Sequence, residues 1–308
     1  MDKIFTALLF IFMFSSTQAE PIIKDLGHTQ VIMGSSTAEF LNTLYNRRFP
    51  NCHNSESMPA FLCSGVVLRV TTKDPDNTYK VWDPSPTSQA TGGVSFSYLR
   101  ADSNFGILAW GNTNGYILYP AFSAPAGKIK LEYLCSYPMD AHGWRRSLKE
   151  VCGPHPEYPT QSVSCQVAGV STAQQWLAVW KSPGVNPNIR QCGFDVRDER
   201  NQLAGPAFYS SLQAKTLLGA EGFNQWNEVI IKRWGPGQPN TYPIMAFFYI
   251  PGNSSVALAD AQYNQLDFYN STQPKISAPI IRLRPGVSPT DMAKFYFDPA
   301  DQAVQLPD

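Results

Sequence analysis

Residues 228–250 read EVIIKRWGPGQPNTYPIMAFFYI, two apolar segments that are joined by a turn and not by a helix. The β-branched and aromatic residues at 228–234 and 243–250 are typical of strands, and the Gly-Pro-Gly at residues 235–237 is typical of a turn. Strands that do not alternate one-to-one with helices indicate an α+β protein. This stretch therefore favours an α+β fold over a doubly wound parallel sheet.

The rest of the chain continues this pattern of many strands and few helices. Further strands are predicted at residues 66–72, 94–99, 116–119, 129–137, 193–196, 280–283 and 295–297, and helices at residues 35–48, 172–180, 206–220 and 258–269. We find no internal repeat and no long linker. We therefore expect a single globular domain over residues 34–308, with a mixed, largely antiparallel sheet at its core and a few helices.

The composition excludes several classes of protein. The chain has 308 residues, with 24 lysines and arginines, 24 aspartates and glutamates, and a formal net charge of zero. Charged residues make up 16% of the chain, below the ~25% of an ordinary soluble protein, and aromatic residues make up 13%. A neutral chain without a run of lysine or arginine lacks the charge pattern of proteins that bind nucleic acids or anionic membranes. We therefore expect neither partner for the mature protein.

The N-terminus has the three-part layout of a secretory signal. Lys3 precedes a continuous apolar stretch at residues 4–14, which is too short to span a membrane. The small and polar residues that follow end in Thr-Gln-Ala, so we expect a signal peptide over residues 1–19 and export of the rest. Residues 20–33 then read as a leader segment with no clear period.

All six cysteines lie after the predicted signal peptide. An even number of cysteines in an exported chain indicates disulfides, and their spacing matches no zinc site. Sequence alone does not fix the pairing, and we expect neighbouring cysteines to close. The expected pairs are Cys52–Cys63, Cys135–Cys152 and Cys165–Cys192. The only four histidines lie in the leader and in loop-like segments, so we predict neither a metal site nor a Ser–His mechanism.

Several segments, taken together, carry a family resemblance. They read PAFLCSGVVLR (59–69), WDPSP (82–86), GGVSFSYLR (92–100), QCGFDVRD (191–198), NEVII (227–231), AFFY (246–249) and YNQLDFYN (263–270). Through them most of the mature chain resembles the halovibrin family of secreted bacterial proteins. The resemblance implies an exported NAD⁺ glycohydrolase, historically described as an ADP-ribosyltransferase, with an ADP-ribosyltransferase-like fold. It implies NAD⁺ as the substrate and no bound cofactor.

Cleavage of the nicotinamide–ribose bond develops positive charge on the ribose, which a nearby carboxylate stabilises. The diphosphate of NAD⁺ needs a cation or backbone donors, and the nicotinamide needs an apolar or aromatic wall. The resemblance implies how these groups are supplied. ADP-ribosyl-transferring folds use an arginine or histidine on a first strand, a strand bearing serine or tyrosine, and a late glutamate.

Arg69 and Glu228 are the predicted catalytic residues. Arg69 lies inside the apolar strand predicted at residues 66–72, where a buried guanidinium needs a partner. That partner is either a substrate phosphate or a structural aspartate. Glu228 opens a β-branched strand, either as the acid beside the ribosyl cation or as a surface carboxylate. Many members of the superfamily carry Glu or Gln two positions earlier, where this chain has Trp226, which favours water over an arginine as the acceptor.

Four further residues are predicted to bind the substrate. Ser95 and Ser97 share one face of the strand predicted at residues 94–99, and Phe96 lies on the other face. The two glycines before this strand would let a ligand approach the backbone closely. The alternative is an ordinary strand with a polar outer face. Arg100 is a second candidate for the phosphate contact, or the cluster around it caps a turn.

Two other functions stay open at this point. One is transfer of ADP-ribose to a protein acceptor. The other is a secreted binding protein without catalysis, which would use some of its seven tryptophans and fourteen tyrosines to bind carbohydrate or protein surfaces. Against the second, most of these aromatic residues are equally well placed in a core.

Overall fold

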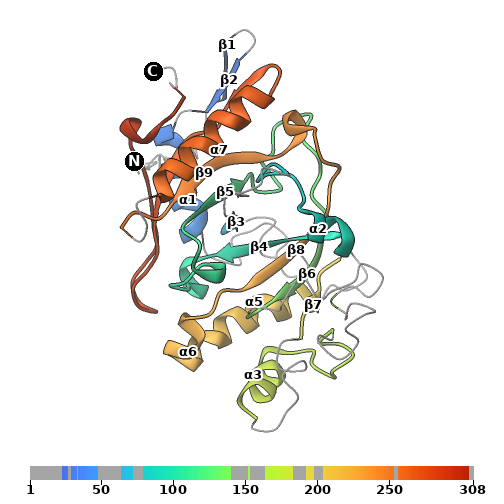
Figure 1. Ribbon diagram of the computed structural model, residues 1–308. Coiled ribbons are helices and arrows are strands. Elements are labelled where there is room, and N and C mark those ends of the chain that lie inside the picture. Colours follow the sequence, from blue (N-terminus) through green and yellow to red (C-terminus); the bar gives the residue numbers. More distant parts are fainter. Residues whose placement is uncertain are drawn as a thin grey trace, which may run out of the picture.

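A large mixed sheet organises the chain in the computed structural model (Figure 1). The structure describes residues 23–26, 29–32, 34–47, 64–71, 79–139, 152, 164–182, 192–197, 204–252 and 256–304. The strands are β1 (Ile23–Leu26), β2 (Thr29–Ile32), β3 (Val66–Val70), β4 (Gly93–Leu99), β5 (Asn114–Leu118), β6 (Tyr133–Tyr137), β7 (Phe194–Asp195), β8 (Glu228–Lys232), β9 (Ile244–Tyr249), β10 (Lys275–Ser277), β11 (Ile280–Arg284) and β12 (Lys294–Phe297). The helices are α1 (Gly34–Asn46), α2 (Pro86–Thr91), α3 (Ala173–Lys181), α5 (Ala204–Lys215), α6 (Ala220–Phe223) and α7 (Ala257–Ser271).

Nine of these strands form one sheet in the order β12-β11-β9-β5-β3-β4-β8-β6-β7. Every neighbouring pair is antiparallel except β9 and β11, which run parallel. The predicted α+β class, with a largely antiparallel sheet and a few helices, is therefore confirmed. The two strands of residues 228–250 are not neighbours, because β8 pairs with β4 and β6 while β9 pairs with β5 and β11.

A second, smaller sheet involves the predicted leader. β1 and β2 both lie within residues 20–33, where the sequence shows no clear period. β2 pairs antiparallel with β1 and parallel with β10. β10 comes directly after α7 and is more than two hundred residues from β2 in the sequence. This stretch is therefore tied to the globular domain by a β-ladder. The predicted signal peptide, residues 1–19, lies outside the described residues.

Both faces of the central strands are buried, each in its own hydrophobic cluster. On β3, Val67 belongs to one cluster and Leu68 to the other, because successive side chains on a strand point to opposite faces. The first cluster includes Phe268 of α7, which lies over β5, β9 and β11. The second includes Leu41 of α1, which lies over β3, β11 and β12 (Figure 1). Strands buried on both faces read as continuous apolar runs, as β9 does.

Two predicted elements end or begin at different positions in the structure. The helix predicted at residues 206–220 is divided, because α5 ends at Lys215 and a 3₁₀ turn then leads to Gly219. Gly219 has a φ of 60°, which glycine adopts without strain, and α6 begins after it. The strand predicted at residues 129–137 begins only at Tyr133.

Two of the three expected disulfides are present. Cys135 of β6 pairs with Cys152, and Cys165 pairs with Cys192. Disulfides of this loop size contribute about 3 kcal/mol each, and they indicate an oxidising compartment. Cys52 and Cys63 lie outside the described residues. No helix in the described part of the chain has the length and apolar character needed to cross a membrane.

Candidate functional site

The candidate site is a pocket where β3 and β4 move apart. These strands pair only from Val66 opposite Leu99 to Leu68 opposite Ser97. Beyond that point the end of β3 pairs with β5, and the start of β4 pairs with β8. A pocket of about 230 Å³ lies at the resulting gap. Five of the six predicted site residues line this pocket, namely Arg69, Ser95, Phe96, Ser97 and Glu228.

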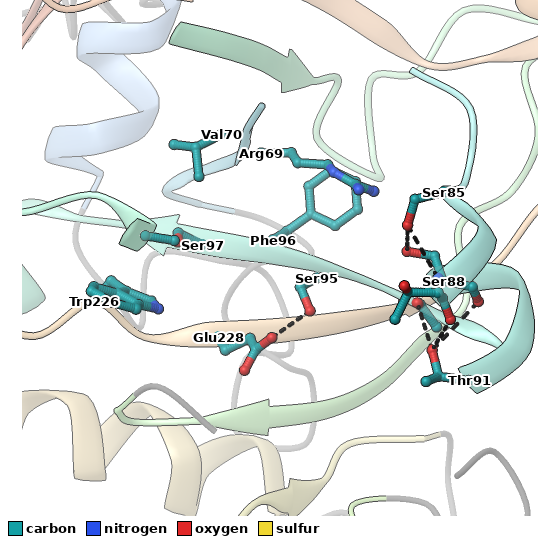
Figure 2. A pocket seen from close by; sticks show the side chains of 13 residues that line it. Arg69, Val70, Ser85, Ser88, Thr91, Ser95, Phe96, Ser97, Trp226 and Glu228 are labelled. Carbon is teal, nitrogen blue, oxygen red and sulfur yellow. Dashed lines mark hydrogen bonds between the residues drawn. The ribbon is translucent and has the colours of Figure 1, made fainter. Parts of the chain in front are cut away.

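A buried carboxylate forms one wall of the pocket. Glu228 begins β8 and is only 4% exposed. β8 pairs with β4 with Phe96 opposite Val229, a register that puts Ser95 and Glu228 on the same face of the sheet. The Ser95 hydroxyl donates a hydrogen bond to Glu228 Oε1, and the two side chains point toward each other in Figure 2. A carboxylate removed from water needs such donors, and Ser95 supplies one of them.

Arg69 reaches the pocket from the other face of the sheet. It shares that face with Phe96 and lies beside Tyr116, its partner in the β3–β5 register. Burial raises the pKa of Tyr116 to about 12, and the guanidinium of Arg69 opposes this shift. Arg69 Nη1 is buried without a hydrogen-bond partner, and Arg69 forms no ion pair within the described residues. A buried donor left without a partner costs about 1–3 kcal/mol, so this nitrogen is a candidate ligand contact.

Arg69 and Glu228 therefore line one pocket from opposite faces of the sheet (Figure 2). Side chains of directly opposite residues share a face, and faces alternate along each strand. The registers of β3 and β8 with β4 therefore put Arg69 on the face of Phe96 and Glu228 on the face of Ser95. The two side chains are near the same gap without facing each other directly. A ligand that contacts both must pass between the separated ends of β3 and β4.

The sequence identified Trp226 only as a departure from a family pattern, whereas the structure places it on the pocket wall. It lies two residues before Glu228 and packs partly against the cluster that contains Leu68. Its indole supplies an aromatic surface at the carboxylate end of the pocket (Figure 2). An aromatic residue two positions from a candidate acid in an extended segment shares its face, and this signal was available in the sequence.

The other end of the pocket is formed by α2, a helix that was not predicted from the sequence. Ser85 caps this helix by accepting a hydrogen bond from the Ser88 amide at 3.2 Å, and its hydroxyl donates to Ser88 Oγ at 3.1 Å. Thr91 Oγ1 donates to the Thr87 carbonyl at 3.0 Å. These hydroxyls are thus engaged in local bonds of the helix. A serine before Pro86, with a glycine six residues after the proline, is the signal that could have revealed it.

Gly92 and Gly93, at the start of β4, have structural roles. Gly92 ends α2 in the left-handed conformation, with a φ of 81°. A Cβ on Gly93 would lie 2.5 Å from the Cγ2 atom of Ile230, so the side chain of β8 occupies the space that a larger residue would need. Close packing of β4 on β8 therefore accounts for Gly93, although this residue also lines the pocket.

Arg100 lies outside the pocket and is fully engaged elsewhere. Its Nε and Nη2 atoms donate to Asp102 at 2.9 and 3.1 Å, and Nη1 donates to Ser64 at 2.6 Å. Its guanidinium also stacks over the ring of Tyr209 at 4.9 Å. Burial lowers the pKa of Arg100, but the neighbouring Tyr98 and Asp102 outweigh burial and leave this pKa raised. Arg100 directly precedes the turn at Ala101–Ser103 and makes no side-chain capping bond to it.

Comparisons with known proteins give no assignment, because no family model matches this sequence and no curated protein matches it. In the part of the chain that the structure describes, no group of three or more His, Cys, Asp or Glu side chains is arranged to hold a metal ion. The four histidines, His28, His53, His142 and His155, lie outside that part.

Proposed function

We propose that this chain is a secreted NAD⁺ glycohydrolase of the halovibrin type, which hydrolyses NAD⁺ to nicotinamide and ADP-ribose. The observation that carries the proposal is the pairing of Glu228 with Ser95 on the wall of a pocket that also contains Arg69. A buried carboxylate, a serine and an arginine with an unpartnered nitrogen are the groups that cleavage of a nucleotide glycosidic bond needs.

In the proposed reaction, Glu228 acts on the ribose. The C1′–N bond breaks, its electron pair leaves with the nicotinamide, and positive charge develops on the sugar. The nicotinamide departs as a neutral molecule because it carries a positive charge in NAD⁺, so it needs no proton. The buried carboxylate stabilises the developing cation, and this effect is stronger away from bulk water. Water then bonds to C1′ and releases one proton, and Ser95 keeps the carboxylate oriented throughout.

The dimensions of the pocket suit the reacting half of the substrate. A volume of about 230 Å³ is below the ~300–1,000 Å³ of pockets that enclose a whole drug-sized ligand. The proposed occupant is the nicotinamide riboside portion, with Trp226 and Phe96 as aromatic walls. The diphosphate would then lie at the gap between β3 and β4, where Arg69 donates to it.

The sheet order supports an ADP-ribosyltransferase-like arrangement of these groups. The strands that carry Arg69, Ser95 and Glu228 are β3, β4 and β8, which are consecutive in the sheet although β8 is far from the others in sequence. Trp226 stands where an acid would assist transfer to an arginine, and water is therefore the proposed acceptor. The disulfides, with the predicted signal peptide, support export from the cell.

The test is direct. The chain without residues 1–19, produced under oxidising conditions, is incubated with NAD⁺, and free nicotinamide and ADP-ribose are measured by chromatography. We expect both products in equal amounts, and we expect the Glu228→Gln variant to release almost none. Survival of NAD⁺ overnight at high protein concentration would contradict the proposal. A parallel reaction uses NAD⁺ labelled in its ADP-ribose part together with an added protein. Release of nicotinamide without free ADP-ribose, and label bound to that protein, would instead indicate transfer.

A further inference from the structure

The segment at residues 225–228 carries both Trp226 and Glu228 into the pocket, and two buried polar side chains hold it. It connects the end of α6 to β8. Trp226 and Glu228 line the pocket, so the position of this short segment sets the position of the proposed acid and of the aromatic wall together.

Asn227 is the first of the two anchors. Its side chain is fully buried, its Nδ2 donates to the Tyr98 carbonyl at 2.7 Å, and its Oδ1 accepts from the Tyr98 amide at 2.7 Å. The β4–β8 pairing ends with Phe96 opposite Val229, and beyond it the Asn227 side chain makes the hydrogen bonds to the Tyr98 backbone that a paired strand would make. This bond pattern fixes the register in which Glu228 meets Ser95.

Lys215 is the second anchor. It is the last residue of α5, and its side chain is fully buried. Its Nζ donates to the carbonyl oxygen of Gln225 at 2.7 Å and lies 5.4 Å from the centre of the Phe105 ring. Within the described residues Lys215 forms no ion pair. Its amine therefore holds the backbone immediately before Trp226.

A buried lysine is an unfavourable choice for packing alone. Burial lowers the pKa of Lys215 to about 7, because the charged amine has lost its water and has gained no carboxylate. A methionine fills a similar elongated space without a group to desolvate. What Lys215 offers beyond methionine is its hydrogen bond to Gln225, three residues before Glu228.

We propose that Lys215 is a positioning residue for the reaction, which acts through the Gln225 carbonyl to hold Trp226 and Glu228 on the pocket wall. The proposal rests on the proposed NAD⁺ glycohydrolase activity for its kinetic consequence. Lys215 contacts neither the substrate nor the reacting atoms in this mechanism. Loss of its hydrogen bond leaves the fold intact and makes the 225–228 segment less well placed.

The experiment compares Lys215→Met with a matched control, Lys128→Met. Lys128 is partly buried, its Nζ donates to a backbone carbonyl, that of Asn240, at 2.8 Å, and burial lowers its pKa to about 8. It does not line the pocket. For both variants we would measure kcat and KM for nicotinamide release, together with the melting temperature.

We expect kcat to fall about tenfold or more in Lys215→Met with an unchanged or raised melting temperature, and to stay within twofold in Lys128→Met. An unchanged kcat in Lys215→Met would overturn the proposal. So would an equal loss of kcat in both variants, because that outcome indicates a general effect of removing a buried amine. A fall in kcat that merely follows a lower melting temperature would assign Lys215 a structural role only.

A second readout does not depend on catalysis. The contribution of Trp226 to the fluorescence is obtained by subtracting the spectrum of Trp226→Phe, in the wild-type and in the Lys215→Met background. We expect this difference spectrum to change in position or intensity when Lys215 is replaced. No change would overturn the positioning role even if the wild-type protein proved inactive toward NAD⁺, so the two proposals fail independently.

Discussion

Two polar clusters lie near opposite ends of β4, and they contain similar groups in different states. The Arg100 cluster consists of Arg100, Asp102, Ser64 and Tyr209. Each of the three guanidinium nitrogens of Arg100 donates a hydrogen bond within this cluster. The pocket cluster consists of Arg69, Ser95 and Glu228, together with the rest of the pocket wall. Here the arginine keeps a buried nitrogen without a partner, and it forms no ion pair within the described residues.

The difference is the one expected between an arginine that only stabilises the fold and an arginine that is available to a ligand. A buried guanidinium whose donors are satisfied fixes the local fold, and removing its partner is costly. A donor left unsatisfied beside a pocket lowers stability, and a ligand can satisfy it. Arg69 and Arg100 were both candidates for the phosphate contact in the sequence, and they differ in how far their donors are already bonded within the protein.

The strongest test of this contrast replaces the acid of the pocket cluster. In Glu228→Gln we expect nicotinamide release to fall about 10²–10⁴-fold, because the amide cannot stabilise the ribosyl cation. The Ser95 hydroxyl still has an amide oxygen to donate to, so folding is preserved. Steady-state kinetics and a thermal melt measure the two effects. Activity within threefold of wild type would show that Glu228 is not the acid of this reaction.

The matching change in the Arg100 cluster is Asp102→Asn. It removes the carboxylate from a guanidinium that is only 1% exposed, and we expect the free energy of unfolding to fall by about 3 kcal/mol. Urea unfolding measures this loss, while kcat/KM of the folded protein stays unchanged. Glu132→Gln is the control, because its pair with Lys232 is exposed on both sides and is worth under about 1 kcal/mol. Equal losses of unfolding free energy in Asp102→Asn and Glu132→Gln would show that the buried Arg100 pair stabilises the fold no more than an exposed pair does.

Local features of this chain were predictable from sequence. The alternation of β3 places Val67 and Leu68 in different clusters, and the same rule puts Ser95 with Ser97 on one face of β4. Nearest-neighbour closure is correct for Cys135–Cys152 and Cys165–Cys192. These outcomes depend on spacing within one segment or between adjacent ones.

Features set by tertiary contacts were not predictable. Asp102 is a local partner of Arg100, but Ser64 and Tyr209 are 36 and 109 residues away in the sequence, so the full bonding of this guanidinium could not be predicted locally. The separation of β3 from β4 depends on where each strand exchanges one neighbour for another. That separation makes the pocket, and it also puts Arg69 and Glu228 on opposite faces.

A smaller effect is expected when the unsatisfied arginine itself is removed. Arg69→Met should raise KM for NAD⁺ about tenfold, because the diphosphate loses a charged donor, with a smaller change in kcat. The melting temperature should not fall, because the side chain removed carries a buried nitrogen without a partner. Arg100→Met is the comparison, and it should lower stability instead. An unchanged KM in Arg69→Met would show that the phosphates bind elsewhere.

The smallest effect concerns Lys215, a third basic side chain, whose pKa is lowered by burial. Its folded-state pKa is about 7, below the ~10.4 of an unfolded lysine, so between these pH values the unfolded chain binds one proton more than the native one. The free energy of unfolding therefore rises with pH above 7. Below pH 7 both states hold the proton and Lys215 adds no slope.

Urea unfolding at pH 7 and pH 8 should accordingly show the wild type gaining about 1 kcal/mol more than Lys215→Met over this interval. The pKa of Lys128 is also lowered, to about 8, and this group contributes in the same direction in both proteins, so its effect cancels in the comparison. Arg100 adds no slope here, because its raised pKa keeps it charged throughout. Parallel pH profiles for the two proteins would mean that Lys215 keeps its charge in the fold, as Arg100 does, and the desolvation argument for its positioning role would then lose its basis.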